Sequence, residues 1–324
     1  MKRLLLILSM VLCLFISGFW INGQITLNAQ DNLPDPSGEM IDIGDHALHI
    51  YCIGEGSPTV ILETGSGVLS LSWYPLQEQI AEFTRVCTYD RAGYGWSDPS
   101  QTPRTALQVA HELDRLLTNA GIETPVILAG HSMGGMFARY FAATHPDLVA
   151  GVVLVDATPP MFSSVVRMEI AGVDAFFQGE AAGYDEFIEF VRSGAWTSQN
   201  AENMVPPGLP VELVETYSQL MSQPAAIEAM YAEYIAFDYN MEQTRAAGDL
   251  GDIPLIVLAG RNAPFPEAWA EDAWQRWVEF QEEQASISTN SRFEALDSGH
   301  YIYVELPDVV LEAIRELIES TSSE

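Results

Sequence analysis

Residues 126–141 read VILAGHSMGGMFARYF, and this stretch decides the fold. The apolar start is typical of a buried strand, and residues 137–141 are typical of a buried helix. Between them lies the pattern G-x-S-x-G, from Gly130 to Gly134, with Ser132 at its centre. A serine on a sharp strand-to-helix turn needs small residues two positions away on each side, because the backbone there is crowded. Unless the pattern is a chance match, it predicts that the turn lifts the Ser132 hydroxyl above a sheet.

Outside this stretch, short apolar runs alternate with helix-like segments. The strand-like runs occupy residues 49–53, 59–63, 85–89, 125–130, 151–156, 253–260 and 292–296. Apolar residues at helical spacing occur in residues 105–119, 133–144 and 307–318. Strands that alternate with helices are typical of a largely parallel sheet covered on both faces, so we predict an α/β fold.

Residues 157–252 break this alternation. They contain no clear strand and many aromatic residues, and residues 211–239 are rich in helix formers. We therefore expect a helical insertion over the end of the sheet. This divides the exported chain into a first core part (31–156), the insertion (157–252) and a second core part (253–324).

The first thirty residues have the layout of an export segment. Lys2 and Arg3 are followed by residues 4–21, which carry no charge, and Trp20 stands where an interfacial aromatic would. Residues 1–30 are interpreted either as a cleaved secretory signal or as a retained N-terminal membrane anchor. In both cases the body of the protein is expected outside the cytoplasm, in an extracellular or periplasmic location.

The charge balance limits the partners that we expect. The formal net charge is −31, and Lys2 is the only lysine. Such a surface is poorly equipped to neutralise a phosphate backbone, so nucleic acid is not expected as a partner. It should also repel anionic membranes, which leaves the N-terminal segment as the only expected membrane contact. Apolar residues make up 48% of the chain, enough to bury a core, and this excludes a disordered protein.

Four stretches in order resemble motifs of the α/β-hydrolase superfamily. They are LETGSG at 62–67, DRAGYGWSD at 90–98, GHSMGG at 130–135 and SGH at 298–300. The resemblance covers nearly all of the chain after residue 40. It implies a mostly parallel eight-stranded sheet, with residues 157–252 as a cap domain after the sixth strand.

The resemblance also implies catalytic roles. Ser132 would be the nucleophile of a catalytic triad, and His300, in a glycine-containing loop after the last strand, would be its base. Backbone N–H groups of Ser66 and Met133 would form the oxyanion hole. His131 is interpreted as structural, because its side chain should point away from Ser132. The other histidines are interpreted as structural or exposed: His46 and His49 in the first strands, His111 in a helix and His145 at a helix end.

The acid of the triad departs from the commoner family pattern. Most relatives place it after the seventh strand, but here that position holds Ala263. Asp156, at the end of the sixth strand, is the substitute that we favour, since some branches of the superfamily keep their acid there. The alternatives are that Asp156 only caps the start of the insertion, with Glu267 or Asp272 as the acid.

Cys52 and Cys87 are the only cysteines in the exported body. The superfamily sheet places their strands side by side, so a disulfide between them is expected in an oxidising compartment, the alternative being two buried thiols. The sequence shows no metal-ligand cluster and no phosphate-binding glycine loop, so no metal or cofactor is expected.

These observations predict an exported serine hydrolase. Its substrate would be a neutral, partly apolar acyl compound, most simply a carboxylic ester, because the net charge disfavours anionic substrates. Alternatives on the same scaffold are a peptidase of the proline-iminopeptidase kind, a C–C bond hydrolase, or a binding protein without catalytic activity. A serine at residue 132 argues against epoxide hydrolase and dehalogenase chemistry, whose relatives use aspartate there.

Overall fold

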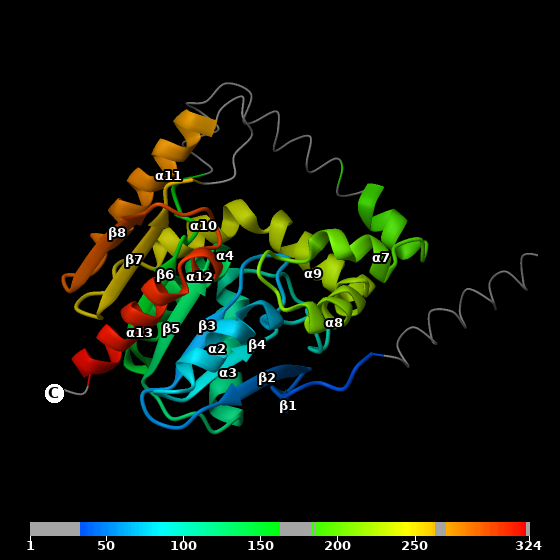
Figure 1. Cartoon of the computed structure of the whole chain (residues 1–324), viewed down its shortest axis with the longest axis horizontal. Helices are drawn as coiled ribbons and strands as arrows, with labels where there is room; N and C mark the ends of the chain where they lie inside the picture. The colour runs from blue at the N-terminus through cyan, green and yellow to red at the C-terminus, as the bar shows by residue number, and fades with distance from the viewer. Residues whose placement is uncertain (1–32, 163–182, 184–185, 263–269, 322–324) are drawn as a thin grey trace, which may run out of the picture.

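One eight-stranded sheet forms the centre of the protein (Figure 1). The computed structural model describes residues 33–162, 183, 186–262 and 270–321. For residues 270–274 it describes the backbone alone. The strand order across the sheet is β1-β2-β4-β3-β5-β6-β7-β8. The strands are β1 (Glu39–Asp42), β2 (Ala47–Ile53), β3 (Val60–Glu63), β4 (Val86–Tyr89), β5 (Val126–His131), β6 (Val149–Val155), β7 (Leu255–Gly260) and β8 (Ser291–Leu296).

Most of the sheet is parallel. β2 pairs antiparallel with β1 and with β4, whereas every other neighbouring pair is parallel. The carboxyl ends of β3 to β8 therefore meet at one edge of the sheet, where loops with functional residues are usually placed. The expected mostly parallel, eight-stranded sheet is thus confirmed.

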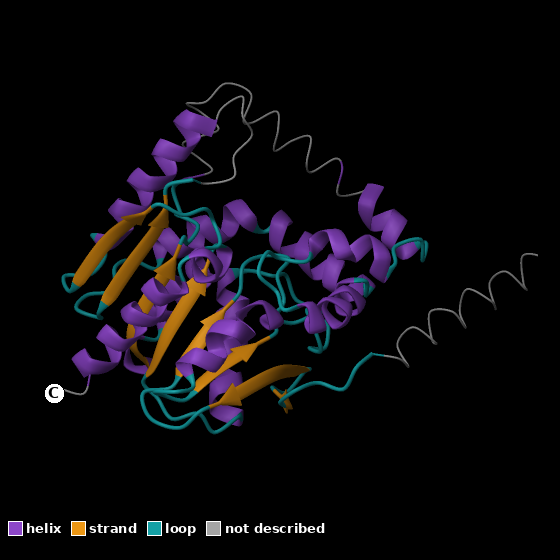
Figure 2. Cartoon of the chain, viewed as in Figure 1, coloured by secondary structure: helices purple, strands orange, loops and turns teal. Residues whose placement is uncertain are grey.

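Helices cover both faces of the sheet (Figure 2). The α-helices are α2 (Tyr74–Ile80), α3 (Ala106–Asn119), α4 (Met133–Thr144), α7 (Ser198–Ala201), α8 (Val211–Met221), α9 (Pro224–Ile235), α10 (Phe237–Ala246), α11 (Ala270–Ala285), α12 (Ile302–Glu305) and α13 (Pro307–Thr321). Short 3₁₀ helices are η1 (Ser70–Trp73), η2 (Pro146–Leu148) and η3 (Glu202–Met204).

Alternate residues of each central strand enter different cores. In β5, Val126 and Leu128 pack into the core under α3 and α4, whereas Ile127 and Ala129 pack into the core under α2 and α13. Successive side chains of a strand point to opposite faces, and here both faces are covered. This explains why the strands read as continuous apolar runs rather than as alternating patterns.

The described part of residues 157–252 is helical, as expected. Helices α8 and α9 share a third apolar core with residues at the ends of the sheet, among them Leu69 and Tyr94. Figure 1 shows α8 and α9 beyond the ends of β3 and β4, while α10 lies closer to α4. The insertion therefore contacts the edge of the sheet at which the parallel strands end.

Two details differ from the sequence expectations. Strand β1 was not among the strand-like runs, because EMID at residues 39–42 has an acidic residue at each end and lies at the sheet border, where its residues are mostly exposed. His46, expected in a strand, lies in the turn that joins β1 to β2. Residues 1–30, interpreted as the export segment, lie outside the described residues. Within the described ranges, no helix is both long enough and apolar enough to cross a bilayer.

Candidate active site

The turn between β5 and α4 holds Ser132 in a strained conformation. Its φ of 54° and ψ of −124° lie outside the regions that side chains normally allow. Glycines make this turn possible, because a Cβ atom on Gly134 would lie 2.2 Å from the carbonyl oxygen of Thr64, and one on Gly130 would lie 2.6 Å from the Cα of Gly135. The G-x-S-x-G pattern thus has the role expected from the sequence: it brings the turn against its neighbours while Ser132 stays half-buried.

The loop after β3 lies directly over this turn. A Cβ atom on Gly65 would lie 3.2 Å from the Cβ and 3.7 Å from the Oγ of Ser132. Ser66 follows Gly65, and Met133 begins α4, so both expected oxyanion donors belong to segments that border Ser132. A backbone N–H at the first position of a helix has no partner within that helix and is free to bind an anion.

Asp156 lies immediately after β6 and is fully buried. Its Oδ2 lies 2.5 Å from His300 Nδ1. Its Oδ1 accepts hydrogen bonds from the backbone N–H of Gly260 at 3.0 Å and from Trp277 Nε1 at 2.8 Å, with Gln281 Nε2 at 3.4 Å. The carboxylate therefore has its charge compensated on one oxygen and presents the other to the imidazole.

His300 lies in the loop between β8 and α12. Its backbone carbonyl accepts a hydrogen bond from His131 Nε2 at 2.9 Å, and the two imidazole rings are 4.5 Å apart between centroids. The preceding N–H, of Gly299, donates to Glu305 Oε2 at 2.8 Å. Because His131 directly precedes Ser132, these contacts bring His300 to the same strand end as Ser132.

His131 itself is a buried, neutral residue. Burial, together with the nearby His300 ring, lowers its pKa well below the ordinary value of 6.5. Since Nε2 donates to a carbonyl, the proton of the neutral ring is on Nε2, and Nδ1 has no hydrogen-bond partner among the described residues. This agrees with the expectation that His131 is structural.

Of the three candidates for the acid, only Asp156 has a described side chain. Ala263 and Glu267 lie outside the described residues, and Asp272 belongs to α11 but its side chain is not described. The geometry places Asp156 beside His300, while the sequence argument alone left the choice open.

The structure also adds residues that sequence reasoning missed. Trp277 and Gln281 are four positions apart on α11, so they share one face of that helix and both reach Asp156. Gln281 also donates to the carbonyl oxygen of Ala157 at 2.7 Å. Their spacing was visible in the sequence, but nothing there indicated which surface this face of α11 would contact.

This arrangement can be compared with known families. Residues 58–186 match the family model described as the alpha/beta hydrolase fold. The chain has the alpha/beta hydrolase fold. Its sheet, the turn at Ser132 and the histidine after β8 all occupy the positions that the resemblance implied.

Relatives of this hydrolase-fold chain differ in length and in printed name. "Probable transporter efuK" from Hormonema carpetanum is 33% identical over 301 residues, which cover 86% of this chain and 42% of that protein. A pimeloyl-[acyl-carrier protein] methyl ester esterase from Shewanella oneidensis is 35% identical over 114 residues, 35% of this chain and 40% of that protein. The chain thus spans less than half the length of either relative.

Solved structures support the fold over nearly the whole chain. A thermophilic esterase from Thermogutta terrifontis superimposes with a TM-score of 0.59 at 22% identity, and the match covers 88% of this chain and 99% of the esterase. At this identity the likeness shows the α/β-hydrolase fold alone.

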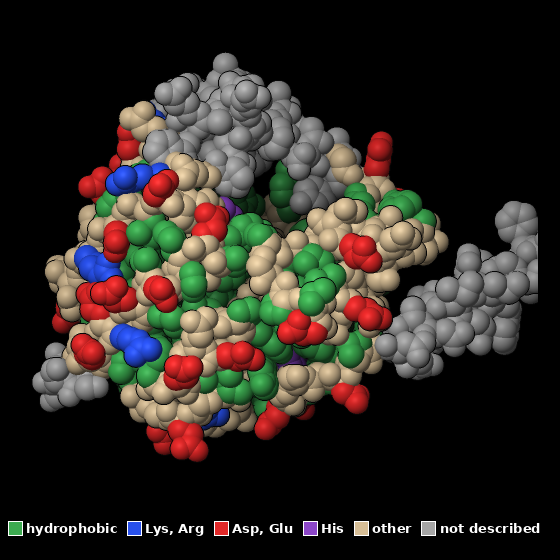
Figure 3. All heavy atoms as spheres, in the orientation of Figure 1, with side chains coloured by type: hydrophobic (Ala, Val, Ile, Leu, Met, Phe, Trp, Pro, Cys, Tyr) green, Lys and Arg blue, Asp and Glu red, His purple; other side chains and the backbone are tan. Residues whose placement is uncertain are grey.

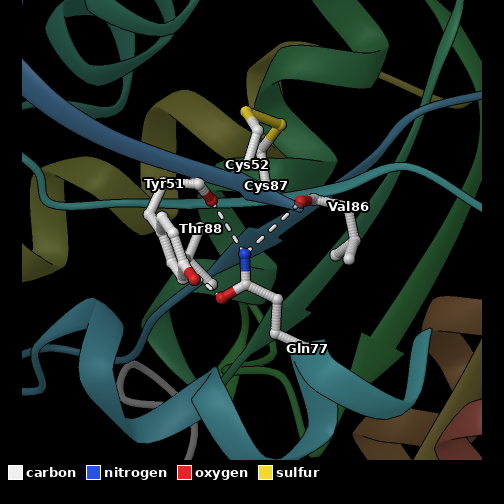
Figure 4. Close-up of a disulfide and its surroundings, with 6 residues drawn as sticks. All are labelled: Tyr51, Cys52, Gln77, Val86, Cys87 and Thr88. Atoms are coloured by element: carbon white, nitrogen blue, oxygen red, sulfur yellow. Dashed lines mark hydrogen bonds between the residues drawn. A yellow bond between two sulfur atoms is a disulfide. The ribbon is translucent and has the colours of Figure 1, made fainter. Parts of the chain in front are cut away.

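The expected disulfide joins Cys52 and Cys87 (Figure 4). The two residues face each other in the register of β2 and β4. On the opposite side of these strands, Gln77 of α2 donates to the carbonyl oxygens of Tyr51 at 2.8 Å and Val86 at 3.3 Å, as Figure 4 shows. The cross-link and the glutamine bridge therefore join the same pair of strands from both faces.

A metal site was not expected from the sequence. Among the described residues, no group of three or more His, Cys, Asp or Glu side chains could hold a metal ion.

Proposed function

We propose that this α/β hydrolase is an exported serine hydrolase that cleaves a neutral, partly apolar acyl compound, most simply a carboxylic ester. The observation that carries the proposal is the contact between the buried Asp156 carboxylate and His300 Nδ1 at 2.5 Å. A ring that donates from Nδ1 keeps the lone pair on Nε2, and this makes Nε2 the basic nitrogen.

In the proposed reaction, Ser132 Oγ attacks the acyl carbon while His300 Nε2 takes its proton. The oxyanion that forms is bound by the N–H groups of Ser66 and Met133. His300 then gives the proton to the leaving alcohol, which departs as the acyl-enzyme forms. Water, activated by the same Nε2, attacks the acyl-enzyme and releases the carboxylic acid with Ser132 restored. Asp156 stabilises the imidazolium in both halves without becoming protonated.

The surface of the protein and the names of similar proteins support a substrate with an apolar acyl group. On the face shown in Figure 3 the surface is hollowed, and hydrophobic side chains are visible in the hollow. Apolar walls with a few polar groups are typical of small-molecule sites. The names of two similar proteins, a methyl ester esterase and a thermophilic esterase, favour ester hydrolysis among the reactions that this fold supports.

Export is part of the proposal. The charge-free run at residues 4–21 after Lys2 and Arg3 supports it, whether the segment is cleaved or kept as an anchor. The Cys52–Cys87 disulfide supports it as well, because disulfides persist mainly in oxidising compartments.

The proposal is tested with a fluorophosphonate probe and two substrate panels. The wild-type protein should be labelled, and Ser132→Ala should not. p-Nitrophenyl esters of varied acyl length should be hydrolysed, whereas aminoacyl arylamides should not. Labelling with turnover of arylamides alone would favour the peptidase, and a folded wild-type protein that the probe does not label would favour the binding protein.

A further inference from the structure

Arg91 is a buried cation that contacts the loop carrying Ser66. It follows β4 in the stretch DRAGYGWSD, and 1% of its surface is exposed. Its Nη1 donates to the carbonyl oxygen of Thr64 at 2.7 Å, and its Nη2 donates to that of Gly65 at 3.0 Å. The planar guanidinium therefore holds the two carbonyls that immediately precede Ser66.

The partner of Arg91 comes from the insertion. Glu233 of α9 is fully buried, and its carboxylate accepts hydrogen bonds from Arg91 Nε at 2.7 Å and Arg91 Nη2 at 3.1 Å. The pair is bidentate, a geometry that defines the position of both groups. A carboxylate of the inserted helix thus compensates the charge of the residue that holds the loop.

The same carboxylate reaches the other side of Ser66. Tyr94 Oη donates to Glu233 Oε2 at 2.8 Å, and the hydroxyl oxygen accepts from the backbone N–H of Gly67 at 3.0 Å. The loop is therefore tied to Glu233 before Ser66 through Arg91, and after Ser66 through Tyr94.

Helix α9 packs closely against the two loops that contain Gly67 and Gly93. A Cβ atom on Gly93 would lie 2.8 Å from the Cβ of Ala229, and one on Gly67 would lie 2.8 Å from the Sδ of Met230. Both glycines have positive φ, 87° and 69°. The helix therefore approaches the backbone of the two loops at positions where a larger residue would displace it.

A second carboxylate completes the cluster. Glu63 Oε1 lies 2.5 Å from Arg91 Nη1, and Tyr89 donates to Glu63 as well. Arg91 would thus keep an ionic partner if Glu233 were neutralised. A change from Glu to Gln at residue 233 leaves one acceptor oxygen and one NH₂ group, so it breaks the bidentate link to α9 without leaving Arg91 as an uncompensated buried charge.

We propose that Glu233 is a positioning residue of the oxyanion hole. Through Arg91 and Tyr94 it holds the backbone on both sides of Ser66, so that the Ser66 N–H is correctly aimed only while α9 of the insertion is docked. The inference rests on the proposed hydrolase function, in which this N–H stabilises the oxyanion.

The central test compares Glu233→Gln with Glu228→Gln. Glu228 is on the same helix but pairs with Arg192 at the surface, which makes it a matched control. Loss of one oxyanion donor lowers kcat by about 10²–10³-fold, so a misaimed donor should lower kcat for a p-nitrophenyl ester by at least ~10-fold. KM should change less than about threefold, since the oxyanion exists only after attack on the acyl carbon.

A second variant separates positioning from folding. Tyr94→Phe keeps the ring in its core and removes only the hydroxyl that links Gly67 to Glu233. It should also lower kcat selectively, and in the Glu233→Gln background it should lower kcat less than in the wild type, because the two act through one link. Far-ultraviolet circular dichroism like that of wild type, together with a cooperative urea-unfolding transition, would establish that the variants are folded.

The outcomes distinguish the two proposals. A wild-type protein that reacts with the fluorophosphonate probe, together with a folded Glu233→Gln variant whose kcat matches that of Glu228→Gln, would overturn the positioning role alone. Equal losses in ester turnover and in binding of the product acid would also overturn it, since that pattern indicates a general structural defect. A wild-type protein without probe reactivity would overturn the proposed function and this inference with it.

Discussion

Replacing Asp156 by Asn should place the His300 ring in the wrong tautomer. Oδ1 of Asp156 faces three donors, Gly260 N at 3.0 Å, Trp277 Nε1 at 2.8 Å and Gln281 Nε2 at 3.4 Å. An Asn amide has one oxygen and one NH₂ group, and only the oxygen can face donors. The NH₂ group must then point at His300 Nδ1, the atom that lies 2.5 Å from the carboxylate in the wild type.

This orientation removes the proposed base. Nδ1 of His300 must accept a hydrogen bond from the amide, so the proton of the neutral ring moves to Nε2. A protonated Nε2 has no lone pair for the hydrogen of Ser132. The wrong tautomer at a Ser-His-Asp site lowers kcat about 10⁴-fold. At about 1.36 kcal/mol per factor of ten, this is roughly 5.4 kcal/mol of barrier.

The assay is kcat for a p-nitrophenyl ester, measured on wild type and three variants. Asp297→Asn is the matched control, because Asp297 lies in the same loop as His300 and its exposed carboxylate accepts a hydrogen bond from Asn262 Nδ2 at 3.0 Å. Glu267→Gln tests the rival acid and should change kcat little. Retention of kcat within tenfold in Asp156→Asn, or a larger loss in Glu267→Gln, would refute the reasoning.

Two further predictions concern neighbours of the Asp156–His300 pair. Trp277→Phe removes one charge-assisted hydrogen bond to Asp156 and should lower kcat about tenfold, the lower end for a bond to a charged group; an unchanged kcat in the folded variant would show that the other donors suffice. His131 has a folded pKa well below its ordinary 6.5, so the unfolded chain binds the proton first as pH falls. Stability should therefore fall below about pH 6.5, by up to ~1.4 kcal/mol per pH unit, and stop falling below the folded pKa. Urea unfolding from about pH 7.5 to 5 should show a smaller slope in His131→Asn, and equal slopes would contradict this assignment.

Much of the fold could be predicted from local pattern. The runs that became β3 to β7 are largely apolar and almost fully buried, because both faces of the sheet are covered there. A largely apolar run bounded by turns can be recognised without a structure. Strand β1 was missed for the converse reason: it is a border strand with polar residues, and it pairs only with β2. Pairing of that kind depends on a neighbour's register rather than on the strand's own composition.

The candidate active site, like the fold, could be predicted from the sequence only in part. The turn at Ser132 could be predicted because its constraint is local. Three glycines within five residues of Ser132 relieve the crowding around one strained backbone position. The family resemblance indicated His300 as the base and favoured Asp156 as its acid, but nothing in the sequence indicated Trp277, which is 121 residues from Asp156 along the chain. Sequence left Asp156 as one of three candidates for the acid.

The amino-acid sequence by itself determined the α/β class, the helical insertion and the position of the strained serine, because each depends on side-chain periodicity or backbone sterics within a few residues. Only the tertiary structure decided that Asp156 faces His300, that α11 supplies donors to it, and that Glu233 reaches both sides of Ser66. The physical reason is that a buried polar group needs a hydrogen-bond partner, and the local sequence pattern does not predict which distant segment provides it.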